Sequence, residues 1–373
     1  MTDLVVISLE AWDEVWRRNQ HVIAGLLKTR ADLRVLFVEP PEDPLHAWKQ
    51  KLPRTRGTGL RQVHDLEGVK GRLWAYQGTK WLPRRIDPGG DTRRARRVVQ
   101  VAQKLGFDLP LLWVNDPQGA EVVDLTRWRT LYDITDDWLA AERPRREADR
   151  TAAQERRLLE HVDVVVVCSR ALQSKTAGSK STVLIPNAVD TCAYAQIHAR
   201  PNDLPKGPYA LYVGTLHRDR LDIGLCIETA KAVRGVGELL LLGPIALENA
   251  EVNALAEGGV QLLGRRPASS VPAYLQHAAV LVVPHVQSDF TESLDPIKAY
   301  EYQASGRPVV ATAVPGFRDS DSPLVHVRSG AGFPPMVASL LTDPPVTSTR
   351  TGAPDWTERV ADFAKIISHL EDR

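Results

Sequence analysis

Short apolar runs bounded by turn residues alternate with amphipathic segments along the first half of the chain. Buried strands of a parallel sheet have this appearance, and the amphipathic stretches between them are typical of helices. The apolar runs are Leu4–Ser8, Arg34–Glu39, Leu111–Asn115, Thr130–Asp133 and Val164–Ser169. The expected helices are Arg17–Lys28, Arg93–Lys104 and Ala148–His161. Repeated strand, helix and strand predict a doubly wound α/β sheet.

The same alternation starts again after Asn187. The expected strands are Tyr209–Gly214, Glu238–Gly243, Val260–Leu263, Val280–Pro284 and Pro308–Thr312. The expected helices are Ile223–Arg234, Ser270–His277 and Pro296–Ser305. A chain of 373 residues is long enough for two such domains. We therefore predict an N-terminal Rossmann-like domain over residues 1–187 and a second over residues 188–354.

Turn-forming and irregular segments separate the predicted elements. Pro186 and Asn187 favour a turn at the domain boundary. We expect strands and a long loop over Pro53–Pro88, and a linker over Thr342–Pro354, which is rich in Pro, Thr and Ser. Helical periodicity returns at Trp356–Leu370, so the chain is expected to end on a helix.

The overall charge balance argues against several classes of protein. Lys and Arg number 47 against 46 Asp and Glu, whereas a nucleic-acid binder usually has a clear basic excess. Local basic clusters fit either a solvated helix face or attraction to an anionic membrane surface or an acidic substrate. They are Arg93, Arg94, Arg96 and Arg97, and Arg143, Arg145 and Arg146.

The expected location follows from the cysteines and the apolar runs. The three cysteines are far apart and form no metal-binding or disulfide pattern, which suits a reducing cytosol. We expect no signal peptide, and the longest apolar runs, such as Val162–Val167, are far shorter than a membrane span. We therefore expect a cytoplasmic protein, with peripheral contact at the inner membrane face left open.

The stretch from Glu292 to Thr312 carries the most chemical information. Pro296 suits the first turn of a helix, and Asp295 or Ser293 could cap it. The free N–H groups and positive dipole end of such a helix suit an anion such as a sugar diphosphate. Lys298 adds a charge one turn in, and Glu301 lies three residues later on the same face, where its carboxylate could accept hydrogen bonds from a ribose diol.

This stretch resembles the donor-binding signature of family 4 glycosyltransferases. In that family a Glu, seven residues and a second Glu precede a tail of the form small-x-Gly-x-Pro-Val-Val. Glu301 matches the second Glu, the segment 304–310 matches the tail, and Ser293 stands at the first Glu position, next to Glu292. The resemblance assigns Ser293, Leu294, Asp295 and Glu301 to the donor site, with Lys298 acting on the leaving diphosphate.

Two further segments resemble parts of the same domain. In the strand and loop from Tyr209, Gly214 and Thr215 permit close backbone approach to a phosphate, and Arg218 or Arg220 could grip it. The family usually has an Arg and then a Lys here. Arg265 follows another predicted strand, where it could either stack on the nucleotide base or be solvated.

The N-terminal half is less specific. Trp12–Asn19 occupies the first strand-to-helix loop, which faces the acceptor in a subgroup of these enzymes. Asp136 or Asp137 could cap a helix after the strand Thr130–Asp133, or Asp137 could meet the acceptor or the transferred sugar. Asn115, Asp116 and Pro117 end another strand, at the edge where open α/β sheets bind ligands.

The resemblance implies a GT-B architecture, with two Rossmann-like domains facing a central cleft and the last helix, 355–373, packed back on the N-terminal domain. It implies a glycosyltransferase that moves a sugar from a nucleotide-diphosphate donor to a hydroxyl of a glycan, a lipid-linked acceptor or a small molecule. Retention of anomeric configuration is implied, with no metal and no cofactor besides the donor.

Other enzyme classes lack their motifs, and two alternatives remain. The chain has no G-x-G-x-x-G after its first strand, no phosphate-binding G-x-x-x-x-G-K-[ST], and no zinc-ligand spacing. The alternatives are a non-catalytic nucleotide-sugar-binding subunit of an envelope assembly, which the missing first Glu favours, and a sugar-nucleotide epimerase on the same architecture.

Overall fold

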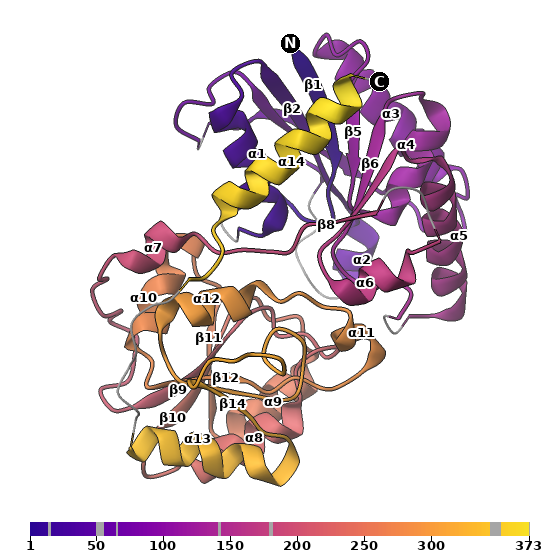
Figure 1. Cartoon of the computed structure of the whole chain (residues 1–373). Coiled ribbons are helices and arrows are strands. Elements are labelled where there is room, and N and C mark those ends of the chain that lie inside the picture. The colour runs from indigo at the N-terminus through magenta and orange to yellow at the C-terminus, as the bar shows by residue number, and fades with distance from the viewer. Residues whose placement is uncertain are drawn as a thin grey trace. The chain divides into compact units, whose positions relative to one another are not determined.

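The computed structural model describes residues 1–13, 16–49, 56–64, 66–140, 143–178, 182–343 and 352–372. The chain forms two compact units (Figure 1). The N-terminal unit comprises Met1–Leu139, Arg143–Pro186 and Thr357–Arg373, and the C-terminal unit comprises Asn187–Trp356 with residues 140–142.

Within the described residues, the N-terminal unit is built on an eight-stranded sheet with the order β3-β4-β2-β1-β5-β6-β7-β8. The strands are β1 Thr2–Ile7, β2 Leu33–Glu42, β3 Gly59–Gln62, β4 Leu73–Thr79, β5 Leu111–Val114, β6 Thr130–Ile134, β7 Val164–Val167 and β8 Thr182–Leu184. All neighbours are parallel except β3 and β4. Because β1 has β2 on one side and β5 on the other, the strand order reverses at β1, where ligands of such sheets bind.

Helices cover both faces of this sheet (Figure 1). They are α1 Arg18–Thr29, α2 Pro44–Lys49, α3 Gly90–Lys104, α4 Ala120–Leu125, α5 Arg145–His161, α6 Arg170–Lys175 and α14 Trp356–Glu371. The largest core of the unit joins α3, α4 and α5 to alternate residues of the strands, such as Leu36 and Val114. On the opposite face, the Phe363 ring of α14 stacks on Trp113 at 4.4 Å between centroids.

The C-terminal unit has, in the part of the chain that the structure describes, a six-stranded sheet of order β11-β10-β9-β12-β13-β14 with all neighbours parallel. The strands are β9 Tyr209–Val213, β10 Glu238–Leu242, β11 Val260–Gly264, β12 Val280–Val283, β13 Val309–Ala311 and β14 Val325–Val327. The helices are α7 Thr191–Ala195, α8 Ile223–Ala232, α9 Asn249–Glu257, α10 Val271–His277, α11 Asp289–Glu292, α12 Ile297–Ser305 and α13 Phe333–Thr342.

The predicted fold class, α/β with two parallel-sheet domains, is confirmed. Each predicted strand and helix has a counterpart that begins and ends within a few residues of the prediction. Nine of the described helices and strands were not predicted: α2, α4, α6, α7, α9, α11, α13, β8 and β14. The linker prediction began too early, because Thr342 is the last residue of α13, while residues 344–351 lie outside the described part of the chain. None of the described helices is both long and apolar enough to cross a bilayer.

Candidate functional site

Lys298 lies at the centre of a polar cluster in the C-terminal unit. It is the second residue of α12, and its Nζ is 2.8 Å from the Tyr212 hydroxyl and 3.2 Å from Nε2 of His285. Nζ also lies 4.0 Å from the centroid of the Tyr212 ring. Tyr212 comes from β9 and His285 follows β12, so two adjacent strands and a helix supply the cluster. Because an ammonium group can only donate, the tyrosine oxygen and the imidazole nitrogen act as acceptors.

Gly214 leaves the space that the ammonium group of Lys298 occupies. This glycine follows β9 with a φ of +148°, and a Cβ added there would lie 2.8 Å from Nζ of Lys298. A Cβ at Gly243, which follows the neighbouring β10, would lie 2.1 Å from the Gly214 carbonyl oxygen. Two glycines therefore bring backbone close together at the carboxyl ends of β9 and β10, beside the cationic group.

Burial and neighbouring cations weaken protonation of this cluster. Burial first, and then Arg220, lower the pKa of Lys298 to about 7, and Glu301 opposes this shift. Burial, Lys298 and Arg220 hold the pKa of His285 well below its usual value, so its imidazole is neutral. Because Lys298 and Arg220 repel each other, an anion that binds beside them would be stabilised by both charges.

The structure distinguishes the two arginines of the loop after β9. Arg220 is half-buried, its guanidinium lies 5.4 Å from the Phe290 ring centroid, and its charge affects both Lys298 and His285. The Arg218 side chain is 74% exposed and lies 3.7 Å from a carboxylate oxygen of Glu251. Arg220 is therefore the arginine that accompanies Lys298. Thr215, predicted beside them, is half-buried after Gly214.

Glu301 lies one helical turn after Lys298, but the two side chains form no ion pair with each other among the described contacts. Burial raises the pKa of Glu301, while Lys298 and the hydroxyl of Tyr194 act in the opposite direction. The carboxylate is thus partly removed from water, close to a cation and a phenol. Such a carboxylate can accept hydrogen bonds from ligand hydroxyls.

The capping prediction for α12 was wrong. The residue that caps the helix is Pro296, which makes no side-chain cap bond. The Asp295 carboxylate instead accepts hydrogen bonds from the Asn187 N–H at 2.5 Å and the Tyr300 hydroxyl at 2.7 Å. The Ser293 hydroxyl donates to the Phe290 carbonyl at 2.8 Å, since Ser293 ends the short helix α11. Leu294 is buried. The side chains of Ser293 and Asp295 are therefore engaged with the protein itself.

Arg265 comes from another strand end of the C-terminal unit. It is exposed directly after β11, and its carbonyl oxygen accepts a hydrogen bond of 2.9 Å from Arg266. Arg266 in turn pairs with Asp203 at 2.7 Å. Stacking of Arg265 on a base remains a prediction.

Asp137, the predicted site residue of the N-terminal unit, does not cap a helix. Its carboxylate accepts a hydrogen bond from the Leu139 N–H at 3.2 Å and forms an ion pair with Lys175. The next helix, α5, begins only at Arg145 after Pro144. Asp137 therefore stabilises a turn at the carboxyl end of β6, and the same is true of the Asp136 carbonyl, which accepts from Trp138 N–H.

A buried polar network at the same edge of the sheet was missed in the sequence. Arg18 forms two hydrogen bonds to the fully buried Asp133 carboxylate, of 3.1 and 3.2 Å. Asn115 donates to the same carboxylate, and Asn19 donates to Asn115 and to Ser8. The sequence did contain a signal for this network. An Arg and an Asn begin the first helix, and polar residues lie at the ends of three strands of the same sheet.

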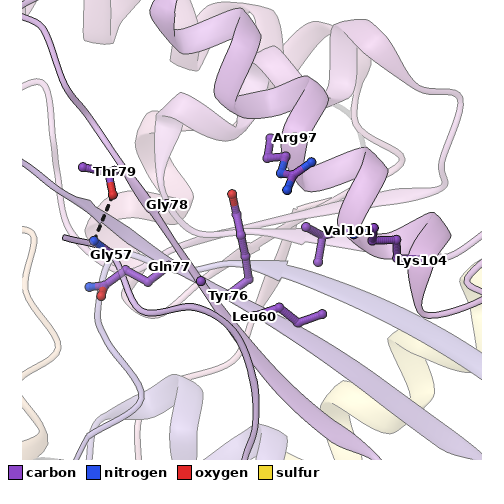
Figure 2. Close-up of a pocket in the computed structure, with 10 residues that line it drawn as sticks. Gly57, Leu60, Tyr76, Gln77, Gly78, Thr79, Arg97, Val101 and Lys104 are labelled. Carbon is purple, nitrogen blue, oxygen red and sulfur yellow. Dashed lines mark hydrogen bonds between the residues drawn. The ribbon is translucent and has the colours of Figure 1, made fainter.

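Two cavities in the described part of the N-terminal unit bear on function. One, of about 80 Å³, lies at the carboxyl ends of β1, β2 and β5, where the strand order reverses, and Asp91, Arg94, Asp116 and Gln118 are among its lining residues. Burial raises the pKa of Asp116 to about 6. The other, of about 250 Å³, lies between β3, β4 and α3 (Figure 2). Tyr76 lines both cavities.

Comparison with known families places the Lys298 cluster in a recognised domain. Residues 207–343 match the family described as glycosyl transferases, group 1. This range lies wholly within the C-terminal unit and includes Gly214, Lys298 and Glu301. The fold of the whole chain is that of GT-B glycosyltransferase structures, whereas membership of family 4 in particular stays a prediction.

Individual known proteins and solved structures resemble this chain over different parts of its length. A putative teichuronic acid biosynthesis glycosyltransferase, TuaH of Bacillus subtilis (strain 168), is 24% identical over 235 residues, which cover 58% of this chain and 58% of that protein. Sucrose-phosphate synthase of Thermosynechococcus elongatus superposes with a TM-score of 0.67 at 20% identity, over 100% of this chain and 98% of that chain. Anabaena HepE in complex with UDP and glucose superposes with a TM-score of 0.69 at 16% identity, over 99% and 100%.

Proposed function

We propose that this protein is a glycosyltransferase that binds a nucleotide-diphosphate sugar in its C-terminal unit and transfers the sugar to a hydroxyl acceptor. The observation that carries the proposal is the half-buried ammonium group of Lys298 beside Gly214, with Arg220 close enough to lower its pKa. Two cations beside a glycine turn at the end of a strand suit a diphosphate. The match of residues 207–343 to group 1 glycosyl transferases supports the same reading.

In the proposed reaction, the bond between the anomeric carbon and the diphosphate oxygen breaks while the acceptor oxygen bonds to that carbon. The acceptor proton passes to the leaving diphosphate, so atoms and charge balance. Lys298 and Arg220 would stabilise the negative charge that grows on the leaving group, which is electrostatic catalysis. Glu301 would accept hydrogen bonds from the ribose hydroxyls. Retention of configuration and independence of metal ions are part of this proposal.

The acceptor is proposed to bind in the N-terminal unit, at the 80 Å³ cavity where the strand order reverses. Apolar side chains such as Val38 and Val98 line it together with Asp91, Arg94 and Asp116. A cavity lined by apolar side chains with a few polar groups among them is typical of small-molecule sites. Asp137 lies at the end of a neighbouring strand and is proposed to meet the acceptor or the transferred sugar.

The central test is calorimetric titration of UDP, GDP and dTDP into the wild-type protein and Glu301→Gln. We expect one nucleotide to bind, and the substitution to weaken its affinity about tenfold or more, because a hydrogen bond to a charged group contributes about 1.5–3 kcal/mol. The matched control is Glu292→Gln, since Glu292 pairs with Arg318 at the surface, at 2.8 Å. Unchanged affinity in Glu301→Gln would mean that the ribose is held elsewhere.

Product analysis separates the alternatives. Release of the nucleoside diphosphate that requires an added hydroxyl acceptor and survives EDTA would support metal-independent transfer. Nucleotide-sugar binding without release of the diphosphate would support the non-catalytic subunit. This alternative stays open because Ser293 stands at the first Glu position and its hydroxyl donates to the Phe290 carbonyl. An altered nucleotide sugar without release would support an epimerase.

A further inference from the structure

The 250 Å³ cavity of the N-terminal unit belongs to a different unit from the proposed donor site, and it adjoins the proposed acceptor site, with which it shares Tyr76 and Gly78. It is lined by the edge hairpin β3–β4 and by the outer face of α3. Figure 2 shows Arg97, Val101 and Lys104 on the helix, with Tyr76 and Leu60 across from them. The lining contains two cations, Arg97 and Lys104, and no acidic side chain. Its charge therefore suits an anion.

Neither cation is neutralised within the described part of the chain. Arg93 and Arg94, on the preceding turn of α3, pair with Asp87 and Asp91. Arg97 has only a hydrogen bond to the Gln100 side chain, at 3.2 Å, and no ion pair is found for Lys104. Lys104 lies seven positions after Arg97, so the two project from the same helix face two turns apart. A negatively charged group between them would gain from both charges at once.

In the opposite wall, two backbone segments lie close together and carry polar groups. The Gly57 N–H donates to the Thr79 hydroxyl at 2.9 Å, and a Cβ at Gly57 would lie 2.2 Å from the Gly78 carbonyl oxygen. Only glycine permits this close approach, which holds the chain before β3 against the end of β4. In Figure 2 the Tyr76 hydroxyl points towards the side of the cavity on which Arg97 lies. The phenol can thus donate to the same anion.

An apolar residue lines the cavity, and an exposed aromatic residue lies two positions after its lining residue Thr79. Leu60, in the lining, is 40% exposed, and the side chain of Trp81, just beyond β4, is exposed at 55%. The Arg56 guanidinium lies 4.9 Å from the Trp81 ring centroid, and Arg56 directly precedes Gly57 of the lining. An exposed tryptophan beside cations is typical of a surface at the membrane–water interface, where the ring enters the headgroup layer and the charges meet lipid phosphates.

We propose that this cavity binds the headgroup phosphate of an anionic membrane phospholipid, held by Arg97, Lys104 and the Tyr76 hydroxyl, with Trp81 inserted beside it. The sequence left open whether the basic cluster of α3 contacts a membrane. The proposal locates such a contact at this cavity. The inference does not depend on the identity of the sugar donor, because no residue of the C-terminal unit takes part.

Co-sedimentation of the full chain with phosphatidylglycerol and phosphatidylcholine vesicles tests the proposal. We expect binding to the anionic vesicles alone, and about 30-fold weaker binding in Arg97→Gln/Lys104→Gln, since each such charge contributes about a factor of five near an anionic surface. The control is Arg96→Gln/Lys70→Gln, which removes the same charge from two exposed residues outside the cavity. Trp81→Ala should also weaken binding, whereas Trp48→Ala, which removes a tryptophan that is similarly exposed at 57%, should not.

Several results would overturn the inference. Equal losses in both double variants would show attraction by overall charge and not a headgroup site. Binding of inorganic phosphate that is lost in Arg97→Gln/Lys104→Gln, without binding to vesicles, would show a soluble anion as the ligand. Unchanged melting temperatures in all variants verify that they fold, and nucleotide affinity measured on the same samples tests the proposed donor site separately.

Discussion

If Lys298 holds the donor diphosphate, nucleotide affinity must depend on pH in a way set by its lowered pKa. In the free protein this pKa is about 7, against an ordinary value of 10.5. Two phosphates beside the ammonium group favour its charged form, so the pKa rises on binding. Binding therefore takes up a proton whenever the pH exceeds about 7, and affinity falls as the pH rises.

The magnitude follows from the fraction of Lys298 that is protonated before binding. With a pKa of about 7, roughly nine-tenths of the molecules carry the charge at about pH 6 and roughly one-tenth at about pH 8. The dissociation constant should therefore rise about tenfold over this range, which corresponds to about 1.4 kcal/mol. At about pH 8, nearly one proton should be taken up per nucleotide bound.

Lys298→Met provides the reference, because methionine preserves the length of the side chain without its charge. The nucleotide titrates too, since phosphate groups have a pKa of about 6, and the ratio of wild-type to variant affinity removes this contribution. Isothermal titration in two buffers of different ionisation enthalpy counts the protons directly. Lys206→Met, which removes an exposed lysine from the same unit, should keep the wild-type profile. A ratio that stays constant with pH would refute the placement of the diphosphate at Lys298.

Stability without ligand gives a second readout of the same pKa. Between about pH 7 and 10.5 the unfolded chain binds a proton at residue 298 that the folded protein does not. The stability of the wild-type protein should therefore rise with pH across this window. Below about pH 7, Lys298 is protonated in both states and should contribute no pH dependence. Denaturant titrations of Lys298→Met should lack this slope.

The N-terminal unit allows three further predictions, each measurable by denaturant unfolding. Phe363→Ala should lower the free energy of unfolding by about 3–5 kcal/mol, because it empties a fully buried position stacked on Trp113. Arg18→Met should cost about 3–5 kcal/mol by leaving Asp133 buried without its cation, and a smaller loss in Arg18→Met/Asp133→Asn than in the single variant would confirm that reason. Burial raises the pKa of Glu155 to about 7, so the folded state holds a proton that the unfolded state releases above about pH 4.5. Stability should therefore fall as the pH rises from about 4.5 to 7. Glu155→Gln should remove this slope.

The amount of structure that could be predicted from the sequence differs between fold and site. The period and length of the apolar runs are local properties, so most strands of the two sheets and the longer helices, such as α1, α3 and α5, could be placed from them. Most of the elements that were missed are short: α2, α4, α6, α7 and α11 have four to six residues, and β8 and β14 have three. The longer helices α9 and α13 were missed too, and α13 has Pro334 and Pro335 in its first turn. Capping of α12 was misjudged because the Asp295 carboxylate finds stronger partners outside the helix, in Asn187 and Tyr300.

The sequence by itself determined that Lys298 and Glu301 share one helix face and that Gly214 follows a buried strand, because helix and strand periodicity set these relations between near neighbours. Only the tertiary structure decided that the ammonium group of Lys298 meets Tyr212, 86 residues away, and that Arg220 rather than Arg218 accompanies it. Contacts over such separations depend on which strands are adjacent and where each loop turns. The lowered pKa of Lys298 likewise comes from its burial among other cations, a property of the packed chain that no local pattern contains.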